Sequence, residues 1–279
     1  AYAPDAIIEA STQLDFHDPL APGAWRRGIA TADVDYSLQE ASQRLRTDAA
    51  RVIDHLEGGG SPDDEYVVRK VRRVNEGCAA MNANIESQAA RWLDAGRIVG
   101  LVGGDHSTPY GLIRALGARH AEFGILHIDA HCDLRDAYEG FEFSHASIMF
   151  NVLRDVPQAV RIAQVGVRDF SEGEAALAAS SERIATFDDL SLAAARFRGD
   201  GLTFENCPHT GTPVSGGLTF NEAVWLLAVL ARSGRRIIGF DVVEVCPAPD
   251  QRIDAITGAR MLWKLCGLTL ASNAEKAGK

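Results

Sequence analysis

Residues 123–133 read FGILHIDAHCD, and this stretch decides how the rest of the chain is interpreted. The mostly apolar run at 123–128 predicts a buried β-strand, and Asp129, His131 and Asp133 follow where that strand ends. Alternate residues of an extended segment point the same way, so one short stretch can present two carboxylates and an imidazole. Helix capping uses carboxylates but does not require histidine. The pattern therefore favours a metal site over a set of caps.

Apolar strands alternate with helical patterns over most of the chain. Besides a short N-terminal strand at 6–8, strands are predicted at 97–102, 123–128, 162–167, 183–187 and 237–243. Helices are predicted at 37–57, 67–95, 109–120, 144–154, 220–233 and 254–268. Strands that are apolar on both faces and alternate with helices indicate a largely parallel sheet covered on both sides. We find no internal repeat and no linker, so we expect a single domain over residues 1–279.

The composition narrows the class of protein. The 279 residues carry 28 Lys+Arg and 38 Asp+Glu, a formal net charge of −10, whereas a nucleic-acid-binding protein normally has a basic face. No apolar run approaches the roughly 20 residues that a membrane span needs, so no membrane partner is expected. The five cysteines include no C-x-x-C pair. They are typical of reduced thiols and predict a cytoplasmic protein.

Two other predicted strands are also followed by polar residues. His106 comes shortly after the strand at 97–102, and Glu244 comes directly after the strand at 237–243. Ligands of open parallel sheets bind beyond the carboxyl ends of the strands, so we expect these residues at the same edge as the three quoted above. Imidazoles with several carboxylates suit Mn²⁺, Zn²⁺ or Fe²⁺, and a carboxylate-rich set favours Mn²⁺. Asp105 alone is interpreted as a helix cap, and His145 alone as a histidine at a helix start.

These motifs resemble the ureohydrolase family, which includes arginases, agmatinases and formimidoylglutamases. The resemblance covers most of the chain and is carried by residues 103–107, 129–133, 144–145, 211–213, 216–218 and 239–245. It implies a three-layer α/β/α sandwich with a mainly parallel sheet, a small guanidino or amidino substrate, and a trimeric or hexameric homo-oligomer. It also implies two Mn²⁺ ions per subunit, with a bridging hydroxide that attacks the guanidinium or amidine carbon. By motif, the implied metal ligands are His106, Asp129, His131 and Asp133.

The resemblance also assigns roles to two residues outside the ligand set. His145 is the implied proton shuttle, and a histidine with an ordinary pKa near 6.5 can protonate a leaving amine. Glu244 is the implied carboxylate that holds the guanidinium or amidinium over the nucleophile, which is a positioning effect.

One departure from the family pattern concerns the metal ligands. The family has a further strand ending in Phe-Asp-x-Asp-x-x-Asp-Pro, whose first two aspartates complete the metal pair. Here Phe204 is followed by Glu205, and about seven residues of that motif are absent although its flanks match. Either the protein lacks these ligands and is a metal-poor pseudoenzyme scaffold, or the segment belongs to the protein and this sequence omits it. We favour the second explanation, and Glu205 is a weaker candidate as a substitute ligand.

The sequence says least about the end of the substrate that lies away from the guanidino or amidino group. Arg135 would suit a carboxylate-bearing substrate such as N-formimidoylglutamate, unless it pairs with a nearby acid at 136, 139 or 142. The acidic residues Glu139 and Glu142 could instead attract a cationic tail. The presence of His145 favours an arginase or agmatinase over a formimidoylglutamase. The resulting hypothesis is a hydrolase of C–N bonds in linear amidines, agmatinase-like, with a formimidoylglutamase as the alternative.

Overall fold

The computed structural model describes residues 2–33, 35–197, 210, 212–248 and 251–274. Within these ranges every strand pairing is parallel. β1 (Val99–Val102) pairs with β5 (Gly239–Val242), and β2 (Phe123–Ile128), β3 (Ala159–Val167) and β4 (Ile184–Asp188) follow one another in a second sheet. These are the five strands predicted after residue 90, and the α/β class with parallel pairing is confirmed.

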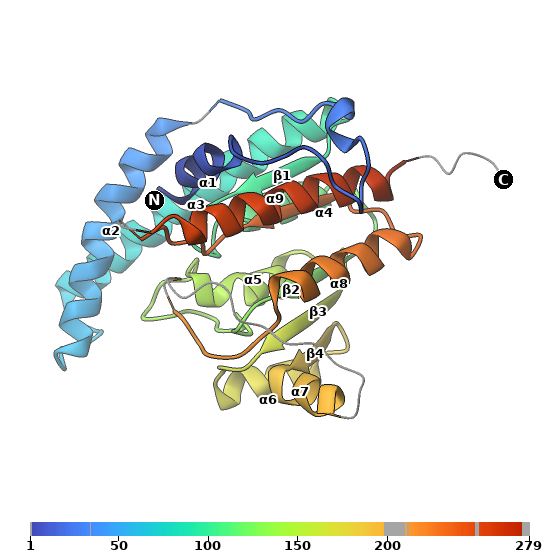
Figure 1. The fold of residues 1–279 in the computed structure, drawn as a ribbon. Helices are drawn as coiled ribbons and strands as arrows, with labels where there is room; N and C mark the ends of the chain where they lie inside the picture. The colour runs from blue at the N-terminus through green and yellow to red at the C-terminus, as the bar shows by residue number, and fades with distance from the viewer. Residues whose placement is uncertain (1, 34, 198–209, 211, 249–250, 275–279) are drawn as a thin grey trace.

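Helices pack around both sheets (Figure 1). They are α1 (Ala3–Ser11), α2 (Tyr36–Glu57), α3 (Glu65–Asp94), α4 (Tyr110–Gly117), α5 (Ile148–Asp155), α6 (Glu172–Ser180), α7 (Asp189–Phe197), α8 (Phe220–Arg232) and α9 (Ile253–Ser272). The helices α6 and α7 were not predicted, although the Ser171–Glu174 capping box marks the start of α6. None of the helices within the described ranges is long and apolar enough to cross a lipid bilayer.

The N-terminal strand prediction at 6–8 was wrong, because the segment forms helix α1. Pro4 occupies the first turn, where its missing N–H costs nothing. Ile7 and Ala10 are buried at helical spacing, and Ile7 packs against α9 near Gly258. A run of three apolar residues cannot separate helix from strand, and here the packing partner decides.

The strand register brings the predicted site segments to one edge. Val102 at the end of β1 is paired with Val242 at the end of β5, and the Gly103 amide donates to the Val242 carbonyl. In the other sheet, β2 continues beside β3 until the Asp129 amide donates to the Val165 carbonyl. The polar residues after β1, β2 and β5 therefore leave the sheets at their carboxyl ends, as expected.

A close contact between α3 and α4 supports the first sheet from outside, and it yields a stability prediction. A Cβ on Gly111 would lie 2.4 Å from the Asn82 carbonyl oxygen and 2.9 Å from the Glu86 amide nitrogen. Gly111→Ala should therefore lower the free energy of unfolding by about 1–3 kcal/mol, measured by urea denaturation. Gly173→Ala, in α6 with open space around it, should raise that free energy by about 0.5–1 kcal/mol. Equal effects of the two substitutions would contradict the packing argument.

Candidate metal centre

Three of the predicted ligands meet in a buried cluster. His106 Nδ1 lies 2.6 Å from Asp133 Oδ2 and 3.1 Å from Asp129 Oδ2. His106 and Asp133 are buried, and Asp129 is only 17% exposed. Segments that are 23 or more residues apart in sequence are thus joined at one point, as the strand-end argument predicted.

The fourth predicted ligand, His131, lies beside this cluster. Its Nδ1 is 3.4 Å from Asp129 Oδ1, the oxygen on the other side of the carboxylate from His106. Its Nε2 is 3.8 Å from Asp169, and its side chain is about one quarter exposed. Asp129 therefore has an imidazole next to each of its two oxygens.

A further histidine, His127, belongs to the same cluster and was missed from the sequence. Its Nε2 lies 3.3 Å from Asp129 Oδ2 and 3.9 Å from Asp133 Oδ2, and its ring centroid is 5.0 Å from that of His106. The available signal was its position two residues before Asp129, which places it on the same side of the strand. In the sequence it is surrounded by the apolar residues of the predicted strand at 123–128, which mask this signal.

The electrostatics of the cluster favour a cation. Burial opposes charge on His106, but its hydrogen bonds to Asp129 and Asp133 outweigh burial and raise the pKa of His106 well above its usual value. Burial also opposes charge on Asp129, but the surrounding imidazoles hold the pKa of Asp129 well below its usual value. The interaction with Asp129 raises the pKa of His131. In the metal-free protein a proton thus compensates the carboxylates, and metal binding should release it.

The backbone at Asp133 is held in an unusual conformation. Asp133 has φ of 55°, in the left-handed region, and its carbonyl oxygen accepts from the amides of Met149 and Phe150 at the start of α5. These two bonds to a helix N-terminus fix the turn that directs the carboxylate toward His106. A strained residue at this position is consistent with a functional site.

The donor set fits a divalent cation. One ligand atom from each of His106, His127, Asp129 and Asp133 lies within 4.8 Å of the others. Ligands of a tetrahedral site with bonds of about 2.0–2.1 Å are about 3.3 Å apart. His106 Nδ1 lies 3.1 Å from Asp129 Oδ2 and 2.6 Å from Asp133 Oδ2. Imidazoles with carboxylates suit Mn²⁺, Fe²⁺ or Zn²⁺. For a second ion, His131 and Asp129 Oδ1 offer two donors. The interrupted motif at Phe204 and Glu205 lies outside the described residues.

Glu244 reaches the same edge from β5. Its amide donates to the Gly104 carbonyl at 2.8 Å, and its Oε1 accepts from the His106 amide at 2.9 Å. Burial raises the pKa of Glu244, while the hydrogen bond from His106 and the charge of His145 act in the opposite direction. Glu244 also has a left-handed φ of 58°. The structure thus brings Glu244 to the metal cluster.

Arg135 has a partner that the sequence did not indicate. Its Nε lies 3.4 Å from Glu174 Oε2 at the start of α6, and its guanidinium lies over the Tyr138 ring. Glu174 is buried, and its Oε1 accepts from the Leu134 amide. Tyr138 also contacts His145, with ring centroids 6.1 Å apart. Arg135 thus holds the segment that follows the metal motif, and its predicted role in substrate binding stays a prediction.

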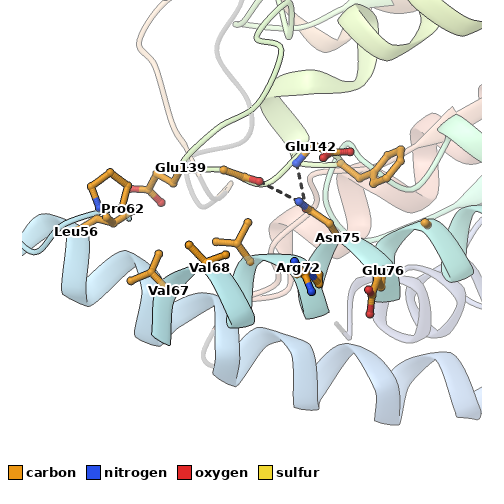
Figure 2. A pocket seen from close by; sticks show the side chains of 13 residues that line it. Leu56, Pro62, Val67, Val68, Arg72, Asn75, Glu76, Glu139 and Glu142 are labelled. Atoms are coloured by element: carbon orange, nitrogen blue, oxygen red, sulfur yellow. Dashed lines mark hydrogen bonds between the residues drawn. The ribbon is translucent and has the colours of Figure 1, made fainter. Parts of the chain in front are cut away.

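A separate pocket of about 800 Å³ lies between α3 and residues 139–143 (Figure 2). Asn75 holds the loop at its edge, because its amide donates to the Gly140 carbonyl and accepts from the Glu142 amide. None of the residues that line this pocket belongs to the metal cluster. The pocket is therefore a feature of the outer side of the loop that leads to His145.

Comparison with known proteins identifies the family. The arginase family profile matches residues 1–196 and 197–267. Agmatinase from Cronobacter sakazakii is 31% identical over 210 residues, which cover 70% of this chain and 67% of that protein. N(1)-aminopropylagmatine ureohydrolase from Thermus thermophilus is 30% identical over 201 residues, which cover 66% of this chain and 67% of that protein.

Solved structures agree on the fold. The agmatine ureohydrolase of Thermoplasma volcanium matches with a TM-score of 0.65 at 18% identity, over 97% of this chain and 83% of that chain. The arginase of Medicago truncatula matches with a TM-score of 0.58 at 22% identity, over 71% of this chain and 69% of that chain. These likenesses confirm the expected arginase-like α/β fold. With the family profile and the sequence relatives, they establish that the chain belongs to the arginase family, the ureohydrolases.

Proposed function

We propose that the protein is a metal-dependent hydrolase that cleaves a C–N bond of a linear guanidine, with Mn²⁺ as its metal and an agmatine-like substrate. One observation carries the proposal. His106, Asp129 and Asp133 converge at a buried point, and the backbone amide of His106 donates to the partly buried carboxylate of Glu244. A cation site and an anion for a cationic substrate are thus adjacent.

The relatives support the enzyme class. They are named as an agmatinase and an aminopropylagmatine ureohydrolase, hydrolases that act on C–N bonds in linear amidines. This bears out the expected hydrolase. The same names favour a guanidino substrate whose other end carries an amine.

The chemistry follows from the side chains. A divalent cation held by His106, Asp129 and Asp133 would lower the pKa of water and supply a nucleophile near neutral pH. Glu244 would hold the guanidinium by charge, and among the described residues its Oε2 has no hydrogen-bond partner and remains free to accept from the substrate. His145, next to Tyr138, would deliver a proton to the leaving amine.

A carboxylate-bearing substrate is the second candidate, and Arg135 is the residue that would favour it. Its guanidinium is already paired with Glu174, so binding a substrate carboxylate would compete with that buried acid. The structure therefore favours agmatine over N-formimidoylglutamate.

The test is reconstitution of the purified, metal-stripped protein with Mn²⁺, followed by a substrate screen. Arginine, agmatine, guanidinobutyrate and N-formimidoylglutamate are each assayed for release of urea, formamide or ammonia. We expect urea from agmatine at the highest rate, and no release without metal. No turnover of any of the four substrates after Mn²⁺ reconstitution would overturn the proposed activity and support the pseudoenzyme scaffold.

A further inference from the structure

A row of three polar side chains, of which the first two are buried, crosses the second sheet beneath the metal cluster. His127 on β2 is in register with Gln164 on β3, and Gln164 is in register with Thr186 on β4. Gln164 is fully buried and His127 is 3% exposed. Burying an amide and an imidazole in the middle of a parallel sheet is unfavourable unless their polar atoms are satisfied. The row therefore needs an explanation that packing does not supply.

The hydrogen bonds of Gln164 fix the orientation of its amide. Its Nε2 lies 2.7 Å from the Cys132 carbonyl oxygen, which can only accept, so the atom there must be the amide nitrogen. Its Oε1 lies 3.2 Å from Thr186 Oγ1, which donates to it. The other hydrogen of Nε2 faces His127 Nδ1 at 3.2 Å. His127 Nδ1 must therefore accept.

This orientation determines the tautomer of His127. A neutral imidazole whose Nδ1 accepts carries its proton on Nε2. His127 Nε2 is buried and lies 3.3 Å from Asp129 Oδ2, and among the described residues it has no hydrogen-bond partner. A nitrogen that carries a proton cannot coordinate a metal ion. His127 thus lies among the possible ligand atoms without being free to ligate.

We propose that His127 is a positioning residue for the metal centre, which donates its Nε2–H to Asp129 Oδ2 once a cation occupies the cluster. The inference rests on the proposed function only in that the cluster binds a divalent cation. Gln164 and Thr186 hold His127 in the donating tautomer, and His127 orients the carboxylate that joins His106 and His131. Outer hydrogen bonds of this kind fix the direction of a ligand and tune its affinity for the metal. This role explains why the buried Nε2 of His127 has no other hydrogen-bond partner among the described residues, because its acceptor is the Asp129 carboxylate that it orients.

Two amide substitutions at residue 127 test the assignment. The amide of His127→Gln can donate from near the Nε2 position, whereas the shorter amide of His127→Asn cannot reach Asp129. We expect His127→Asn to weaken Mn²⁺ binding by about 10–100-fold in calorimetric titration. His127→Gln should bind near the wild-type value. With Co²⁺ in place of Mn²⁺, both should keep the visible absorption band positions of the wild type, because the ligands are unchanged. His17→Gln, at an exposed histidine far along the chain, is the control.

Three results would overturn the inference. If His127→Asn binds Mn²⁺ as tightly as the wild type, His127 does not orient a ligand. If both variants lose Mn²⁺ alike and shift the Co²⁺ bands, His127 is itself a ligand. If the wild type binds no Mn²⁺, both this inference and the proposed function fail, whereas either of the first two results leaves the proposed function standing.

Discussion

Asp129→Ala should weaken Mn²⁺ binding by more than about 100-fold, which exceeds the 10–100-fold loss typical of residues outside the ligand shell. Asp129 lies next to three imidazoles, those of His106, His127 and His131, and contacts them through both carboxylate oxygens. No other carboxylate among the described residues occupies this central place. The measurement is calorimetric titration of the metal-stripped protein with Mn²⁺.

The matched control for this substitution is Asp169→Ala. Asp169 also lies near His131, at 3.8 Å, but its side chain is 69% exposed. The control removes the same charge from the same neighbourhood, so it separates ligation from general electrostatic attraction. Asp169→Ala should bind Mn²⁺ as the wild type does. Stoichiometric binding by Asp129→Ala would refute the ligand assignment.

The convergence of the site could be predicted because it depends on a rule about strand ends. His106, Asp129, Asp133 and Glu244 each follow a strand that is recognisable from its apolar residues, and parallel strands place such residues at one edge. The fold class followed from the same alternation of strands and helices. Neither of these two predictions depends on the order of the strands in the sheets.

The features that could not be predicted depend on long-range partners. Helix α1 is helical because Ile7 faces α9, which lies some 250 residues later in the chain. Arg135 pairs with Glu174 because α6 begins beside the segment that follows Asp133. The sequence indicated only the nearer acids at 136, 139 and 142. The role of His127 depends on its register with Gln164, and register is a property of the paired strands.

Glu244→Gln should lower kcat/KM for agmatine by about 30-fold to about 4,000-fold. This range corresponds to about 2–5 kcal/mol for removing one partner of a desolvated charge pair, at about 1.4 kcal/mol per factor of ten. The substitution is nearly isosteric. Its amide oxygen can still accept from the His106 amide, as Glu244 Oε1 does at 2.9 Å. The turn after β5 should therefore persist, and the loss would report the charge that holds the guanidinium.

Mn²⁺ titration separates this role from metal binding. Glu244 is not among the clustered ligand atoms, so Glu244→Gln should bind Mn²⁺ with the wild-type affinity while turnover falls. Glu172→Gln makes the same chemical change at an exposed acid in α6 and should leave both quantities unchanged. A parallel loss of Mn²⁺ affinity in Glu244→Gln would make Glu244 part of the metal site. Unchanged kcat/KM would mean that another group holds the substrate. Only loss of turnover with retained Mn²⁺ affinity fits a carboxylate whose partner is the cationic substrate, because a charge acting on the substrate alone leaves the metal equilibrium unaffected.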